Sequence, residues 1–156
     1  MTWRRRDVPP PGTIAEIHAT VDLERTLTDL GLAAPDASAF VTDDLLGARI
    51  LVVERPAGPP LALAEPSTEG RLAATLARHG EGPAGWYVRT WAPLAELRHQ
   101  ARTGGLAVSR TGDGPFGRQV LALDGIPFGR HLILVEVPDV REVPELPEVP
   151  AVPSPP

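Results

Sequence analysis

Three residues of the sequence carry side chains suited to moving a proton: Glu16, His18 and Glu136. Residues 13–21 alternate between apolar and polar types, which predicts a strand with Glu16 and His18 on one face. Glu136 belongs to a second predicted strand, 131–137. Burial raises the pKa of a carboxyl group and an imidazole titrates near neutral pH, so either group can take and return a proton. We therefore assign acid/base catalysis to these three residues.

A second set of side chains is suited to binding substrate. Tyr87 and Arg89 share one face of another predicted strand, and their phenol and guanidinium groups can hold an enolate, carboxylate or phenolate oxygen. Trp91 ends the same strand and completes the expected substrate-binding set. Structural roles compete with these assignments. Glu136 could simply pair with Arg89, His18 could be a hydrogen-bonded structural residue, and Tyr87 and Trp91 could be core or dimer contacts.

The elements that would position these residues occur twice along the chain. The first half predicts strand 13–21, a helix that follows the N-cap Asp22 and ends at Gly31, and strands 48–54 and 60–65. The second half repeats this order with strand 85–91, helix 93–103, and strands 118–124 and 131–137. The third strand of each half has a weak signal, and the candidates are 38–42 and 106–110. We interpret the glycine-rich residues 112–117 as a mobile loop.

The junction between the halves carries a recognisable motif. Residues 61–70 read Leu-Ala-Leu-Ala-Glu-Pro-Ser-Thr-Glu-Gly, and residues 76–82 read Leu-Ala-Arg-His-Gly-Glu-Gly, with a short helix 69–79 capped by Thr68 between them. This segment resembles the junction of methylmalonyl-CoA-epimerase-like and glyoxalase-like proteins of the vicinal-oxygen-chelate superfamily, which also contains bleomycin-resistance proteins. The resemblance implies an α+β fold in which two βαβββ modules form a curved eight-stranded sheet with a concave cleft.

The resemblance also bears on metal binding, because the chemistry of the superfamily usually depends on a divalent ion held by the first and last strands of each module. The four ligand positions fall on Glu16, Ala62, Gly85 and Glu136. Two of them have no donor side chain, so we expect a member of the fold that has lost its chelate, with no metal and no cofactor. An alignment of the two halves of the chain instead pairs Glu65 with Glu136, which would make Glu65 a possible substitute ligand. Glu16, His18 and Glu136 could rebuild a site, although the first two lie ~7 Å apart along one strand.

Composition limits the partners and the domain plan. The chain has 156 residues, no cysteine and a net charge of −5, which disfavours disulfides, thiolate metal sites and nucleic-acid binding. It has no apolar stretch long enough to span a membrane and no secretory signal, so we expect a cytoplasmic protein. We expect a flexible arm over 1–12, one domain over 13–137 with modules at about 13–66 and 85–137 and a linker helix 68–80, and a disordered Pro/Glu-rich tail over 138–156.

These observations favour a small-molecule enzyme of specialised metabolism: a metal-free acid/base isomerase, lyase or cyclase that acts next to a carbonyl group. A drug-sequestering protein of the bleomycin-resistance type is the first alternative, and a metal-dependent lyase or dioxygenase is the second. The expected partner is a small-molecule substrate or ligand, with neither nucleic acid nor membrane. The resemblance further implies a homodimer.

Overall fold

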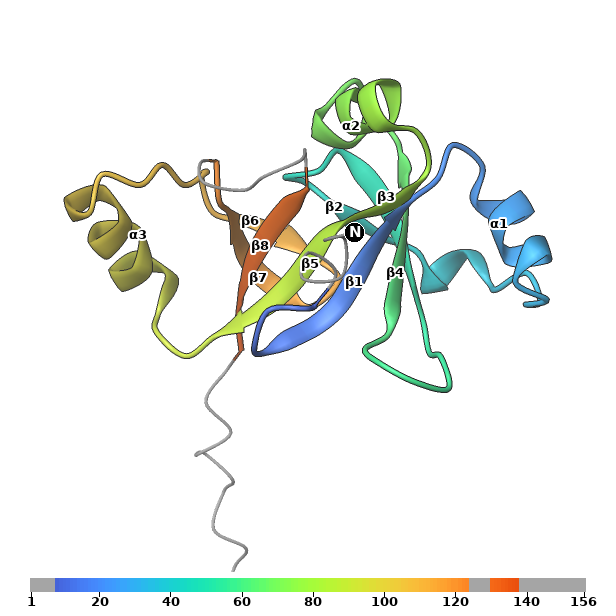
Figure 1. Ribbon diagram of the computed structural model, residues 1–156, viewed down its shortest axis with the longest axis horizontal. Coiled ribbons are helices and arrows are strands. Elements are labelled where there is room, and N and C mark those ends of the chain that lie inside the picture. The colour runs from blue at the N-terminus through green and yellow to red at the C-terminus, as the bar shows by residue number, and fades with distance from the viewer. Residues whose placement is uncertain (1–7, 124–129, 138–156) are drawn as a thin grey trace, which may run out of the picture.

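The computed structural model describes residues 8–123 and 130–137 (Figure 1). Residues 1–7 of the expected N-terminal arm over 1–12, and the whole expected tail over 138–156, lie outside this range. The described elements of the first module are β1 (Thr13–Ala19), α1 (Leu23–Asp29), a 3-10 turn (Ala37–Ala39), β2 (Val41–Asp43), β3 (Ala48–Val53) and β4 (Leu61–Pro66). Helix α2 (Arg71–His79) follows, and the second module contains β5 (Gly82–Thr90), α3 (Leu94–Thr103), β6 (Gly112–Gly114), β7 (Gly117–Leu121) and β8 (His131–Glu136).

The strands form one mixed sheet in the order β2-β3-β4-β1-β5-β8-β7-β6. Within each module the first strand pairs in parallel with the last, β1 with β4 and β5 with β8, and the remaining pairs are antiparallel. The modules join through the antiparallel pair β1–β5. This topology confirms the predicted α+β class and the two βαβββ modules.

The third strand of each module lies elsewhere than the sequence predicts. β2 begins three residues later than the candidate 38–42, and β6 forms at Gly112–Gly114 instead of at 106–110, where Val108 makes only an isolated bridge to Ala122. Both strands are short and contain aspartate or glycine, two residue types that are depleted in strands. Their residue types therefore predict a strand only weakly. Residues 112–117, interpreted as a mobile loop, instead contribute to the β6–β7 hairpin.

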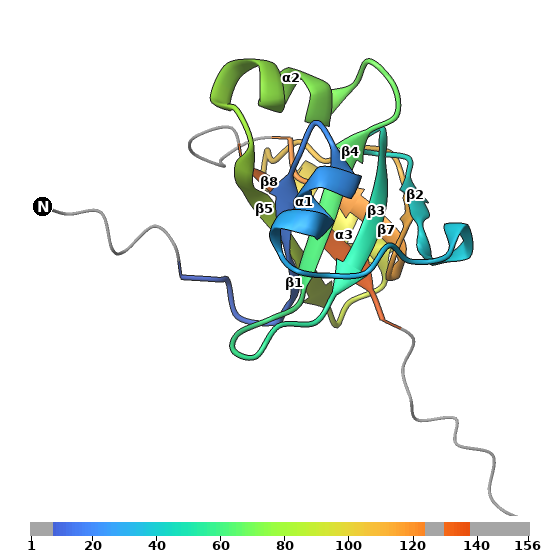
Figure 2. The same cartoon turned by 90° about the vertical axis from the view of Figure 1, so that its right-hand side faces the viewer.

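The two faces of the sheet are covered differently. Helices α1 and α3 flank its convex side, and α2 lies across one end (Figures 1 and 2). The α1 residues Leu23 and Leu27 pack on Leu51 and Leu63. The concave side holds the main core, which includes Ala15, Ile17, Ile50, Ala62, Tyr87, Leu121, Ile133 and, from α2, Leu72.

The outer strands β2 and β6 approach each other, so the sheet is nearly closed into a barrel. The backbone N–H of Asp44 donates to the carbonyl of Asp113 at 3.2 Å. The concave side is therefore filled by core side chains, and its open space lies toward the end that α2 covers.

Local capping explains where the helices begin. Asp22 caps α1 as predicted, because its carboxylate accepts the N–H of Arg25 at 2.9 Å. Helix α2 begins after Gly70, so the expected Thr68 cap is wrong. Glu81 of the His-Gly-Glu-Gly motif ties the linker to the first module, because its carboxylate accepts from Thr20 Oγ1 and Val21 N at 2.9 Å and pairs with Arg25. None of the described helices is long and apolar enough to cross a bilayer.

Candidate functional site

Glu16 and His18 share the convex face of β1, as the alternation predicts, but this face lies opposite the concave core. Glu16 is opposite Trp86 in the β1–β5 register, and its carboxylate accepts from Arg55 Nη2 at 2.6 Å. Burial lowers the pKa of the His18 imidazole, an effect that the charge of Glu81 partly opposes. The two residues therefore stay together on an outer surface.

Tyr87 lies on the concave side of the sheet and is completely buried. In the strand register it is paired with Ala15 of β1 and with Ile133 of β8. Its hydroxyl donates to Asp43 Oδ2 at 2.6 Å. Burial, and then the neighbouring Asp43 carboxylate, raises the pKa of the Tyr87 phenol well above its ordinary value. Tyr87 thus occupies the core role that the sequence left open as the alternative to substrate binding.

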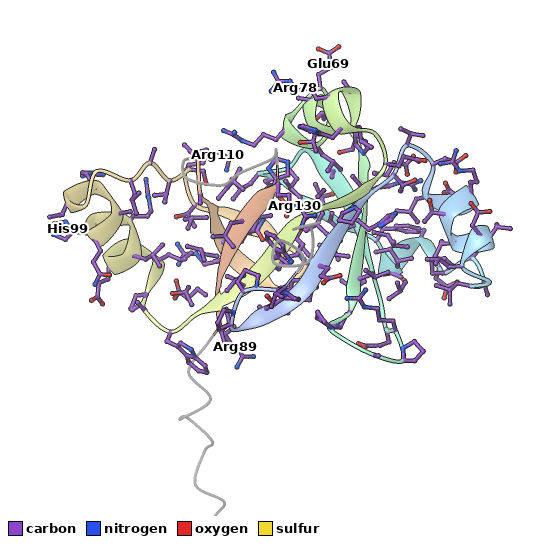
Figure 3. All side chains as sticks on the ribbon, in the orientation of Figure 1. Glu69, Arg78, Arg89, His99, Arg110 and Arg130 are labelled. Atoms are coloured by element: carbon purple, nitrogen blue, oxygen red, sulfur yellow. The ribbon has the colours of Figure 1, made fainter. Side chains whose placement is uncertain are left out.

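The remaining predicted residues gather at the far end of the second module. Glu136 Oε2 accepts the backbone N–H of Leu94 at 3.1 Å and so caps α3, whose N-cap residue Pro93 has no side-chain acceptor. The Arg89 guanidinium lies 5.2 Å from the centre of the Trp91 ring, and Trp91 is 85% exposed. Figure 3 shows Arg89 at the end of the sheet opposite α2.

The structure therefore does not bring the six predicted residues into one site. Glu16 and His18 share the convex face, whereas Tyr87 is inside and Glu136 lies at a strand end. The reason is that alternation identifies the two faces of a strand without telling which one is concave. On β1 the concave face carries the apolar residues Ala15 and Ile17. The catalytic and binding roles of the six remain predictions.

The concave face also decides whether the superfamily's divalent ion fits. At the centre of the sheet this face presents Ile17, Ala62 and Gly85 in register, none of which has a donor side chain. A side chain at position 85 has no room, because a Cβ there would lie 1.9 Å from the carbonyl oxygen of His131. Across the described part of the chain, no three His, Asp or Glu residues cluster closely enough to hold an ion. These residues do not fit the family's metal.

A cavity of about 300 Å³ opens between α2 and the adjoining ends of β7 and β8. Among the residues that the structure describes, its lining is basic and contains no carboxylate. It consists of Arg71, Ala74, Thr75, Arg78 and His79 from α2, Leu121, Ala122 and Leu123 from β7 and its end, and Arg130 and His131 from the start of β8. A concave site with a few converging polar groups is the usual form of a small-molecule pocket.

His131 is the titratable group best placed in this cavity. Its Nε2 atom lies 2.8 Å from Thr75 Oγ1, and the single hydroxyl hydrogen of Thr75 is donated to the carbonyl of Arg71 at 3.0 Å. When Thr75 keeps its hydroxyl hydrogen on the Arg71 carbonyl, it accepts from His131, and this tautomer carries the ring hydrogen on Nε2 and a free lone pair on Nδ1. Burial and the charge of Arg71 lower the pKa of His131, against a smaller opposing effect of Asp43.

Two arginines of the cavity, like Arg98, Arg102 and Arg118, have no carboxylate partner among the described residues. Arg25, Arg49 and Arg55 form salt bridges with glutamates. Arg71 and Arg78 form no salt bridge or hydrogen bond with any side chain in the described ranges 8–123 and 130–137. Unpaired guanidinium groups around a cavity favour an anionic ligand.

Sequence reasoning did not include His131, Arg71, Thr75 or Arg130 among the site residues. Within the linker helix, Arg71, Thr75 and Arg78 recur at helical spacing on one face, which is also the pattern of an ordinary solvated surface. Only the position of α2 across the end of the sheet brings Thr75 of that face against His131.

Comparisons with known proteins support the fold. No protein-family model and no curated protein matches the chain. Among solved structures, methylmalonyl-CoA epimerase from Mycobacterium tuberculosis superposes with a TM-score of 0.63 at 20% identity, over 80% of this chain and 87% of that one. A hypothetical protein from Bacillus halodurans C-125 gives 0.62 at 16% identity, over 81% and 94%.

A methylmalonyl-CoA epimerase variant from Streptomyces coelicolor, in complex with 2-nitronate-propionyl-CoA, gives a TM-score of 0.61 at 20% identity, over 81% of this chain and 97% of that one. The chain therefore has the fold of the glyoxalase, or vicinal-oxygen-chelate, superfamily, as its junction motif predicts. Its structural neighbours with this fold include methylmalonyl-CoA epimerases from two organisms.

Proposed function

We propose that this chain is a metal-free acid/base enzyme that binds an anionic carbonyl compound in the cavity beside α2, with His131 as the group that moves the proton. The observation that carries this proposal is the hydrogen-bonded pair His131–Thr75, which holds an imidazole with a lowered pKa in a cavity lined by arginines. A neutral imidazole at neutral pH is the form that acts as a base.

The arrangement supports a two-step proton transfer. His131 Nδ1 takes a proton from the carbon next to the carbonyl, and the electron pair of that C–H bond moves to the carbonyl oxygen to give an enolate. Arg71, whose charge already acts on His131, stabilises the enolate oxygen. The imidazolium then returns the proton to carbon for an isomerisation, or to a departing group for an elimination. Thr75 fixes the ring orientation throughout.

Proton transfer can be measured as deuterium uptake in D2O, followed by loss of the ¹H NMR signal next to the carbonyl. The probes are 2-oxoglutarate, dihydroxyacetone phosphate and methylmalonyl-CoA. We expect exchange with at least one probe, and His131→Gln should slow it about 100-fold, the usual contribution of a general base. His99→Gln, an exposed histidine on α3 (Figure 3), is the matched control and should leave the exchange unchanged.

Two results would contradict the proposal. Exchange that survives His131→Gln but is lost in Glu16→Gln, His18→Gln or Glu136→Gln would return catalysis to the residues predicted from the sequence. Binding of the probes without exchange would favour the sequestration alternative.

A further inference from the structure

The charge around the cavity is one-sided. Among the described residues, Arg71 and Arg78 line it together with two histidines, and no carboxylate does, although the whole chain carries a net charge of −5. Arg130 also lines the cavity, but its guanidinium lies 5.2 Å from the centre of the Trp86 ring. Arg71 and Arg78 have no counter-ion among the described residues, and an anionic ligand would relieve the repulsion between these like charges. A ligand with a single negative charge would neutralise only one of these two guanidinium groups.

The arginines also lie at two separate positions. Arg71 and Arg78 are seven residues apart on α2, which places them two turns and ~10.5 Å apart on the same face of the helix. Arg71 is the one whose charge acts on His131, so it marks the reacting end. Arg78 lies toward the other end of the helix, where Figure 3 shows its side chain at the outer surface of α2. A ligand that reaches both needs an anionic group at each end.

The cavity is small as well as cationic. A volume of about 300 Å³ stands at the lower limit of ligand pockets in proteins and encloses a compound of a few carbons. A coenzyme A thioester, such as the ligand in the Streptomyces coelicolor structure, has far more atoms than this volume encloses.

From these observations we infer that the cavity binds a small dianionic carbonyl compound, with one carboxylate or phosphate group at Arg71 and a second anionic group at Arg78. This inference rests on the proposed function for the position of the reacting carbon beside His131, but the preference for two anionic groups is a separate property of the arginines.

Matched pairs of probes test the preference by isothermal titration calorimetry. 2-Oxoglutarate and 2-oxopentanoate have the same number of carbons, but only the first has a second carboxylate. We expect 2-oxoglutarate to bind at least tenfold more tightly than 2-oxopentanoate. Dihydroxyacetone phosphate against dihydroxyacetone tests phosphate as the anionic group, and coenzyme A tests the larger ligand.

Variants locate the second anionic group. Arg78→Gln should weaken 2-oxoglutarate at least tenfold and leave 2-oxopentanoate unchanged, whereas Arg71→Gln should weaken both. Arg110→Gln is the control, because Arg110 is exposed outside the cavity lining. The inference is overturned if neither anionic probe binds more tightly than its matched partner, if Arg78→Gln has no effect, or if coenzyme A binds more tightly than every small probe.

The two proposals can fail separately. Preferential binding of a dianion without deuterium exchange would support the ligand class and contradict acid/base catalysis. Exchange that is equally fast with 2-oxoglutarate and 2-oxopentanoate would support catalysis and contradict the ligand class.

Discussion

Tyr87 donates its hydroxyl hydrogen to Asp43 at 2.6 Å, and this buried bond joins the second module to the first across the inside of the sheet. Asp43 also accepts the backbone N–H groups of Leu45 and Leu46 at 2.9 Å and the amide of Gln119 at 2.8 Å. All four donors therefore depend on one carboxylate, which is itself fully buried.

Loss of the phenolic hydroxyl should lower stability. Tyr87→Phe removes one hydrogen bond to a buried carboxylate, and a bond to a charged group is worth about 1.5–3 kcal/mol. We expect the free energy of unfolding to fall by that amount, measured by urea denaturation followed by circular dichroism. Asp43→Asn should also destabilise, and Asp44→Asn, at the exposed neighbouring position, is its control. Equal stability of the Asp43 and Asp44 variants would contradict this role.

Gly85 should tolerate no side chain. A Cβ at this position would lie 1.9 Å from the carbonyl oxygen of His131, where the backbones of β5 and β8 approach. We expect Gly85→Ala to cost more than about 3 kcal/mol or to yield no folded protein. Gly105→Ala is the control, because its φ is also positive but no atom lies within 4 Å, and it should cost about 1–2 kcal/mol. A thermal melt of each variant makes the comparison.

Stability should fall as the solution becomes mildly acidic. The pKa values of His18 and His131 are lower in the folded chain than the ordinary value of 6.5. Between the folded and unfolded values the unfolded chain binds more protons, so the free energy of unfolding decreases as the pH falls below about 6.5. Replacing both residues by glutamine should flatten this dependence in urea titrations between pH 7.5 and 5.5. An unchanged slope would show that other groups cause it.

Substitution of Glu136 distinguishes the catalytic role predicted from the sequence from the helix-capping role seen in the structure. The sequence predicts that Glu136→Gln abolishes turnover while ligand binding survives. The structure places Glu136 five residues along β8 from His131, ~16 Å away, where it caps α3. We expect Glu136→Gln to keep both stability and exchange, since its amide oxygen can still accept from Leu94, and Glu136→Ala to lose about 1 kcal/mol of stability. A stable, inactive Glu136→Gln would favour the sequence-based assignment.

The sequence predicts the fold better than the site for physical reasons. Caps and turns are local, so Asp22 and the positive-φ Gly31 mark the ends of α1 directly. The junction motif is also local, and Glu81 within it makes contacts that fix the linker. Which face of β1 is concave depends instead on the curvature of the whole sheet. The sequence-based assignment took the polar face, with Glu16 and His18, as the concave one, but this face is convex.

The cavity depends on contacts between distant segments. Thr75 and His131 are 56 residues apart, and nothing in the local pattern of either predicts that they meet. A sequence-based search would need to ask which basic residues of the linker helix face the start of the last strand. That question has an answer only once the strand order is known.

The hydrogen bond between Asp44 and Asp113 has a consequence for behaviour at high concentration. The outermost strands of an open sheet expose unpaired N–H and C=O groups, which can recruit extended segments of other molecules and start aggregation. Here β2 and β6 are three residues long and lie against each other. We therefore expect the folded chain to resist edge-to-edge assembly, and concentrated samples should show no thioflavin-positive material until the two edges separate.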